Sequence, residues 1–267
     1  MNKKHGNSRY GQWRCAAVLL AIAAGCMAAP PRAADAAGPP IGINVGWPID
    51  WYGEWIFADA QKQNRQWMDT SRNWLTNVDS NGWPQQDAND GVFYGVQDGV
   101  NMAGTYGLSF NGQATVSLRN GSATISNQIY NSGTNTTTAT IINSGNNTTN
   151  LELSFTNTKR TSGSLTNTGI TNVQIMRPTA EGGNTPIAFG TLFYPPYLTL
   201  MSHFGTLRFM QYGRIWGSAV VNWSDRTVPG WESQSYNIGN FIDKSPSRRC
   251  LGVRDRALQC GERRYVG

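Results

Sequence analysis

The stretch TYGLSFNGQATVSL at residues 105–118 decides the fold prediction. Polar and apolar side chains alternate on both sides of Asn111-Gly112, which is the pattern of two strands joined by a tight turn. We therefore predict an antiparallel hairpin here. The same strand-like texture, separated by turn-rich Asn, Gly, Ser and Thr, recurs at residues 122–130, 136–142, 150–156 and 172–176.

Short strands spaced in this way predict a β-sandwich, which we place at residues 91–180. The alternative is a β-solenoid or adhesin-like array built on Asn/Thr ladders. The strand spacing keeps no fixed period, and this favours the sandwich.

The segments that flank this β-block have a strand-and-helix texture. Before it, residues 41–45 predict a short buried strand. Residues 54–68 predict a helix, because apolar side chains recur there at about every 3.6 residues. After the block, residues 196–204 predict a short helix and residues 206–210 a buried strand. The predicted fold class is mainly β with minor α: a β-sandwich inserted in an incomplete (β/α)-barrel-like scaffold. The two scaffold segments span residues 37–90 and 181–243.

The N-terminus has the three parts of a secretory signal. A basic start is followed by an apolar run at residues 15–29 and by an A-x-A cleavage pattern at residues 34–36. We predict that residues 1–36 are a signal peptide and that the protein is secreted, at the cell surface or in the periplasm. Two alternatives stay open. One is a lipoprotein attached through Cys26, and the other is a membrane anchor, for which the apolar run is short.

Charge is unevenly distributed along the chain. Residues 37–243 hold ten Lys and Arg against thirteen acidic residues, a net charge of −3, whereas the leader and the tail are basic. A nucleic-acid-binding protein needs a basic face, so this balance argues against such a partner. The cysteines lie outside this body, and the chain has no nucleotide-binding fingerprint and no His cluster. We therefore expect no metal or other cofactor.

Tryptophan is abundant, with ten in the chain. A flat aromatic face can stack on a sugar ring while nearby polar groups bond its hydroxyls. Any single Trp is more often a core or loop-anchoring residue, but as a set they favour carbohydrate contact. The tryptophans in or beside predicted loops are Trp47, Trp51, Trp55, Trp83, Trp216, Trp223 and Trp231.

The sequence does not identify a catalytic pair. Glycosidase chemistry needs two carboxylates that face each other across the scissile bond. The acids near the aromatic clusters are Asp50, Glu54, Asp225 and Glu232, and nothing singles out two of them. His203 is the one histidine outside the leader, and no nucleophile motif accompanies it.

Several short sequence motifs, spread over residues 42–226, are informative when taken together. They are GIN at 42–44 with DW at 50–51, RQW at 65–67, NGWP at 81–84, and LRFM at 207–210 with WSDR at 223–226. They resemble the N-terminal part of large secreted bacterial glycoside-hydrolase-like (β/α)-barrel proteins, often fused to cellulose-binding modules. The resemblance implies a polysaccharide or oligosaccharide partner. It also implies sugar contacts from Trp47, Asp50, Trp51, Arg208, Trp223 and Arg226.

The resemblance stops before the end of the chain. Gln211-Tyr212 stand where such proteins tend to have Asp-Trp, and no third barrel strand is evident. Residues 244–267 turn Arg- and Cys-rich and aperiodic, which we interpret as a shifted reading frame, with a genuine basic tail as the alternative. Two hypotheses follow. The first is a truncated, sugar-contacting and catalytically incomplete relative of a polysaccharide-degrading enzyme. The second is a non-catalytic carbohydrate-binding or adhesin-like surface protein.

Overall fold

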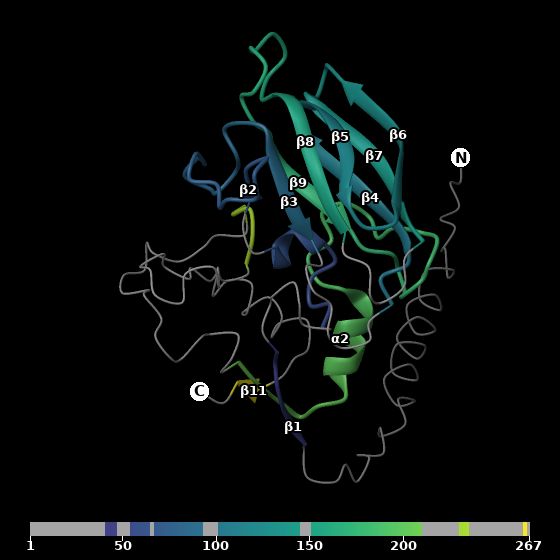
Figure 1. The fold of residues 1–267 in the computed structure, drawn as a ribbon. Coiled ribbons are helices and arrows are strands. Elements are labelled where there is room, and N and C mark those ends of the chain that lie inside the picture. The colour runs from purple at the N-terminus through teal and green to yellow at the C-terminus, as the bar shows by residue number, and fades with distance from the viewer. Residues whose placement is uncertain are drawn as a thin grey trace, which may run out of the picture. The chain divides into compact units, whose positions relative to one another are not determined.

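The computed structural model of the protein describes residues 41–46, 54–64, 67–92, 101–144, 151–209, 230–234 and 264–265. All of them belong to the unit Ile41–Gly267, and their elements are labelled in Figure 1. These elements are β1 (Gly42–Asn44), η1 (Ala60–Gln63), β2 (Trp67–Met68), β3 (Ala88–Val92), β4 (Gly104–Asn111), β5 (Gln113–Asn120), β6 (Ala123–Asn131), β7 (Thr136–Asn143), β8 (Leu151–Lys159), β9 (Thr171–Met176), α2 (Pro195–Ser202), β10 (Thr206–Arg208) and β11 (Arg264–Tyr265).

Two four-stranded antiparallel sheets contain most of the strands. One has the order β2-β3-β8-β5 and the other the order β6-β7-β4-β9. The alternation seen in the sequence sets which face is inward. In β4, Tyr106, Leu108 and Phe110 are buried, whereas Thr105 and Ser109 are partly exposed. The predicted mainly β class with minor α is thus confirmed within the described residues, where no sheet closes into a barrel.

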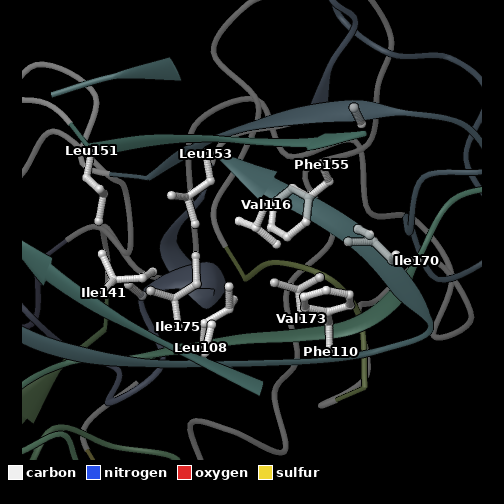
Figure 2. Packing of buried hydrophobic residues seen from close by; sticks show 14 of the residues in the cluster. Leu108, Phe110, Val116, Ile141, Leu151, Leu153, Phe155, Ile170, Val173 and Ile175 are labelled. Atoms are coloured by element: carbon white, nitrogen blue, oxygen red, sulfur yellow. The ribbon is translucent and has the colours of Figure 1, made fainter. Parts of the chain in front are cut away.

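The two sheets turn their apolar faces toward one core. Figure 2 shows Leu108 and Phe110 facing Leu153 and Phe155 across it. The rings of Phe110 and Phe155 meet edge to face, with centroids 5.5 Å apart. Fully burying a side chain of this size stabilises the fold by about 1.5–3 kcal/mol. This core is therefore the main apolar contribution to stability.

The predicted hairpin at Asn111-Gly112 is wrong. β4 pairs with β7 and β9, while β5 pairs with β8 in the other sheet. One residue, Gly112, separates the two strands, which is too few to close a two-residue hairpin turn. The chain instead bends from one sheet into the other. Gly112 has a φ of 108°, and a Cβ there would lie 2.5 Å from the Lys159 carbonyl oxygen, so only glycine fits this corner.

Several asparagines occupy left-handed backbone positions inside strands as well as in turns. Asn127, Asn157 and Asn172 have φ values of 53°, 53° and 51° within β6, β8 and β9. Asn127 and Asn172 coincide with shifts in strand register, which are β-bulges. Asparagine tolerates this conformation better than other residues with a Cβ. Some of the many asparagines therefore allow the irregular backbone that these strands adopt.

A small parallel sheet joins distant parts of the chain. β1 pairs with β10 from Gly42↔Thr206 to Asn44↔Arg208, and β10 also pairs with β11. The helix α2, predicted at residues 196–204, directly precedes β10 and is confirmed. A second apolar cluster contains residues of α2, β10 and the chain around them: Val45, Ile56, Phe57, Phe193, Met201, Leu207 and Phe209. β1 and β10 were predicted to be buried, but Gly42, Asn44 and Arg208 are exposed, because only one face packs on this cluster.

The predicted helix at residues 54–68 is also wrong over the described residues 54–64 and 67–68. These residues form isolated bridges, the 3-10 turn η1, and then β2, which pairs with β3. Asp59 caps η1 by accepting a hydrogen bond from the Gln61 N–H, and the backbone is extended again at Asn64. Asp59 also accepts from the Ile175 N–H at 2.8 Å. Pairing with distant strands thus overrides the helical periodicity.

Candidate functional site

The carboxyl ends of β1 and β10 bring polar side chains to one edge. Asn44 and Arg208 are register partners, and the Val45 N–H donates to the Arg208 carbonyl oxygen at 2.8 Å. Both side chains are exposed. In parallel sheets ligands bind beyond the carboxyl ends of the strands, where neighbouring strands deliver side chains to the same place.

Glu54 joins this edge from the next described segment. Its Oε2 accepts a hydrogen bond from the Gly46 N–H at 3.1 Å. Burial raises the pKa of Glu54 above its ordinary value, and the bond from Gly46 partly opposes that rise. A Cβ at Gly46 would lie 2.1 Å from the same oxygen, so a side chain there would displace the carboxylate. Glycine at position 46 therefore leaves space for the Glu54 carboxylate beside the end of β1.

Of the six predicted sugar contacts, the structure places Arg208 at this edge. The other five, Trp47, Asp50, Trp51, Trp223 and Arg226, lie outside the described residues. Asn44 was not among the predicted contacts, and its register with Arg208 could only be recognised once β1 and β10 were paired.

A second polar cluster forms where residues 230–234 meet η1, and we call it the polar junction. The segment appears in yellow-green in Figure 1. The Gln61 side-chain amide donates to Glu232 Oε2 at 3.1 Å, and Lys62 Nζ donates to the Trp231 carbonyl at 2.6 Å. The backbone adds Gln234 N–H to the Lys62 carbonyl at 2.7 Å. The polar junction therefore ties together segments about 170 residues apart in the chain.

Glu232 is a buried acid of the polar junction with a strongly raised pKa. Burial raises its pKa to about 8, and Lys62 and the Gln61 amide oppose the rise. Burial also raises the pKa of Asp59 and lowers that of Lys62. A carboxyl group that keeps its proton near neutral pH can act as a general acid. Glu232, however, is 8% exposed and bonded to Gln61, so the geometry assigns it a structural role.

Arg177 completes the polar junction on the side of β9. It is buried, and its Nε donates to the Phe57 carbonyl at 3.0 Å and its terminal nitrogen to Gln63 Oε1 at 3.0 Å. Its guanidinium also lies 4.7 Å from the Trp55 ring centroid, a cation–π contact. Burial lowers the pKa of Arg177 to about 10, so it stays charged at neutral pH. Sequence reasoning missed this residue, because no local pattern marks a buried arginine.

Two of the tryptophans that were expected to contact sugar are buried in the structure. Trp55 and Trp83, expected in loops, are buried at 6% and 3% exposure. Trp55 packs against Tyr194 with ring centroids 5.3 Å apart, and Trp83 packs against Trp67 at 6.5 Å. Both rings are packing residues in the protein interior, although they lie in loop segments. Trp231 is partly exposed, and Trp216 lies outside the described residues.

Other classes of site find no support in the part of the chain that the structure describes. No three His, Cys, Asp or Glu side chains gather there as metal ligands, and His203 is exposed at the C-terminal end of α2. None of the described helices has the length and apolar character needed to cross a bilayer. Compared with known protein families, curated proteins and solved structures, the chain gives no match.

Proposed function

We propose that this protein contacts polysaccharide at the carboxyl-end edge of β1 and β10, as a carbohydrate-active protein of glycoside-hydrolase-like type. The observation that carries the proposal is the register of Asn44 with Arg208, with the Glu54 carboxylate bonded to the Gly46 N–H two residues beyond Asn44. Amide, guanidinium and carboxylate groups supply both donors and acceptors for sugar hydroxyls. The described residues supply no facing carboxylate pair to which bond cleavage can be assigned, so we propose binding rather than hydrolysis.

The connectivity supports a more specific fold for this function. The chain runs from β1 through two antiparallel sheets to α2 and then to β10, which is parallel to β1. A strand, a helix and a parallel strand form the repeating unit of (β/α) folds. We therefore propose that the antiparallel sheets are a β-sandwich inserted into one such unit of a barrel-like scaffold, with its ligand edge at Arg208.

Affinity gel electrophoresis of the full-length protein in soluble β-glucans, xylans and galactans tests the binding site. We expect Arg208→Ala to lower affinity by about tenfold or more, because a hydrogen bond to a charged group contributes about 1.5–3 kcal/mol. Lys159→Ala, which removes a positive charge from the end of β8, is the matched control and should retain wild-type binding. Equal retention of both variants would contradict the proposed edge.

We also propose that the protein is exported, on the strength of the tripartite pattern in residues 1–36. N-terminal sequencing of protein recovered outside the cytoplasm should give a first residue near Ala37. A lipid-modified chain that begins at Cys26 would support the lipoprotein alternative instead.

A further inference from the structure

The outer face of the sheet β6-β7-β4-β9 is an ordered array of uncharged side chains. The inward positions of β7 are filled by Thr137, Ala139, Ile141 and Asn143. The alternating positions point outward and carry a row of hydroxyls. In register across β7 and β4 these are Thr140 beside Gly107, and Thr138 beside Ser109. Gln174 of β9 continues the second row as the partner of Ser109.

No residue of β4, β6, β7 or β9 is charged. The outer face of the other sheet is different. There Glu152 of β8 is buried between Arg119 at 3.0 Å and Arg72 at 2.7 Å, and the Arg119 guanidinium also donates to the Thr70 carbonyl. One outer face is thus occupied by ion pairs and the loop that supplies Arg72. The other presents uncharged groups, namely hydroxyls, amides and the exposed apolar side chains Ile129 and Ile142.

An exposed aromatic ring lies on this neutral face. Phe189 is 48% exposed, and its Cζ lies 3.2 Å from the position that a Cβ would take on Gly107. Gly107 faces outward, because its neighbours Tyr106 and Leu108 point into the core. Phe189 is therefore held against the sheet by a glycine that leaves space for it.

The loop around Phe189 is fixed at both ends. Ile187 is buried, and its N–H donates to the Arg177 carbonyl at 2.9 Å. On the other side, the Gly190 N–H donates to Gln174 Oε1 at 3.2 Å. The ring thus has a defined place beside the hydroxyl rows, which lowers the entropy cost of using it in binding.

We infer that this face is a second binding site, and that its ligand is a neutral polysaccharide chain. The ring of Phe189 stacks on the apolar face of a sugar, while Thr138, Thr140 and Gln174 bond its hydroxyls. An anionic polymer would meet no cation on these strands. The exposed side chains Ile129 and Ile142 add apolar surface on which the apolar face of a sugar ring can rest. The site is separate from the edge at Arg208 and does not depend on it.

Pull-down and affinity electrophoresis of the full-length protein test this inference, with neutral glucan, xylan and mannan set against anionic polygalacturonate. We expect retention on at least one neutral polymer, and a loss of about tenfold in Phe189→Ala, the effect of one aromatic stacking contact. Leu165→Ala removes another exposed apolar side chain, 84% exposed and outside these strands, and should bind as the wild type does. Thermal unfolding of each variant checks that the fold is kept.

A charge placed on the face gives a second readout. Thr138→Glu should weaken binding of the neutral polymer, and it should not move the melting temperature by more than a surface substitution does. Wild-type retention in Phe189→Ala and Thr138→Glu, or a preference for the anionic polymer that salt abolishes, would overturn the inference.

The Arg208→Ala variant separates the two proposed sites. Loss of binding in Phe189→Ala alone supports the sheet face and contradicts the edge of β1 and β10. Loss in Arg208→Ala alone overturns the sheet face and leaves the proposed function in place. If the wild-type protein binds none of the polymers, both are overturned.

Discussion

The core between the two antiparallel sheets and the polar junction around η1 hold the protein together in different ways. The core is built from apolar side chains such as Leu153 and Phe155. The polar junction buries Asp59, Arg177 and Glu232, and each of them makes a directional hydrogen bond to a different segment of the chain. Apolar burial is insensitive to pH and tolerant of geometry, whereas buried titratable groups are sensitive to both. The comparison teaches that the core supplies most of the stability, whereas the polar junction determines how distant segments of the chain meet.

The largest expected effect comes from the core. Phe155 contacts Phe110 of the facing sheet and Trp67 of its own, with centroids 5.5 and 5.7 Å away. We expect Phe155→Ala to lower the free energy of unfolding by about 3–5 kcal/mol, since it removes a buried ring and leaves a cavity. Urea denaturation followed by fluorescence measures this change. Ile129→Ala, at a side chain that is 64% exposed, is the control and should change stability by less than about 0.5 kcal/mol.

A somewhat smaller effect is expected at the polar junction. Arg177→Met keeps much of the volume but leaves the Phe57 carbonyl and Gln63 Oε1 without this donor. We expect a loss of about 2–3 kcal/mol, because the buried Phe57 carbonyl loses a charged donor, whereas Gln63 Oε1 keeps the N–H groups of Ile56 and Phe57. Lys159→Met, which removes a charge from a partly exposed position, should be near neutral in the same denaturation experiment. A stable Arg177→Met variant would show that the polar junction contributes little.

The pH dependence of stability should distinguish the two regions. The pKa of Glu232 is raised to about 8 in the fold from an ordinary value of 4.5. Between these values the unfolded chain loses the proton and the folded chain keeps it. Its contribution to stability is therefore full below pH 4.5 and is lost as the pH rises toward 8. Asp59 acts in the same direction and Lys62 in the opposite one, so the informative quantity is the difference between wild type and variant.

Glu232→Gln removes the titrating group at nearly constant size. Denaturation midpoints at a series of pH values from 4 to 9 should decline less steeply in Glu232→Gln than in the wild type. Phe155→Ala should lower stability equally at every pH and keep the wild-type slope. Parallel curves for Glu232→Gln and wild type would mean that Glu232 does not titrate in this range.

The smallest effect concerns an exposed position in β6, the edge strand of one of the two core sheets. Asn127 lies in a bulge of β6 with a φ of 53°. We expect Asn127→Val to destabilise by about 1 kcal/mol, because a β-branched residue is strained in this conformation, and Asn127→Gly to be close to neutral. Thermal unfolding of the pair measures the difference. A Val variant as stable as the Gly variant would show that the bulge relaxes freely.

Most strands could be predicted from the sequence, because alternation of side chains is a local property. Residues 105–118 alternate as two strands should, and both strands exist. Their pairing was wrong, since a partner strand is chosen by the burial of distant faces. The same limit applies to residues 54–68, where helical periodicity was overridden by bonds from Asp59 to β9.

For the candidate sites, too, local features could be predicted from the sequence and contacts between distant segments could not. By itself, the sequence determined most of the strands and the absence of charge in β4, β6, β7 and β9, and the family resemblance proposed Arg208 as a sugar contact. Only the tertiary structure decided that Asn44 lies beside Arg208, that Phe189 rests on Gly107, and that Glu232 is buried against Gln61. The physical reason is that side-chain periodicity reports how each segment prefers to fold. Contacts between segments far apart in the chain depend on how their buried faces close on one another.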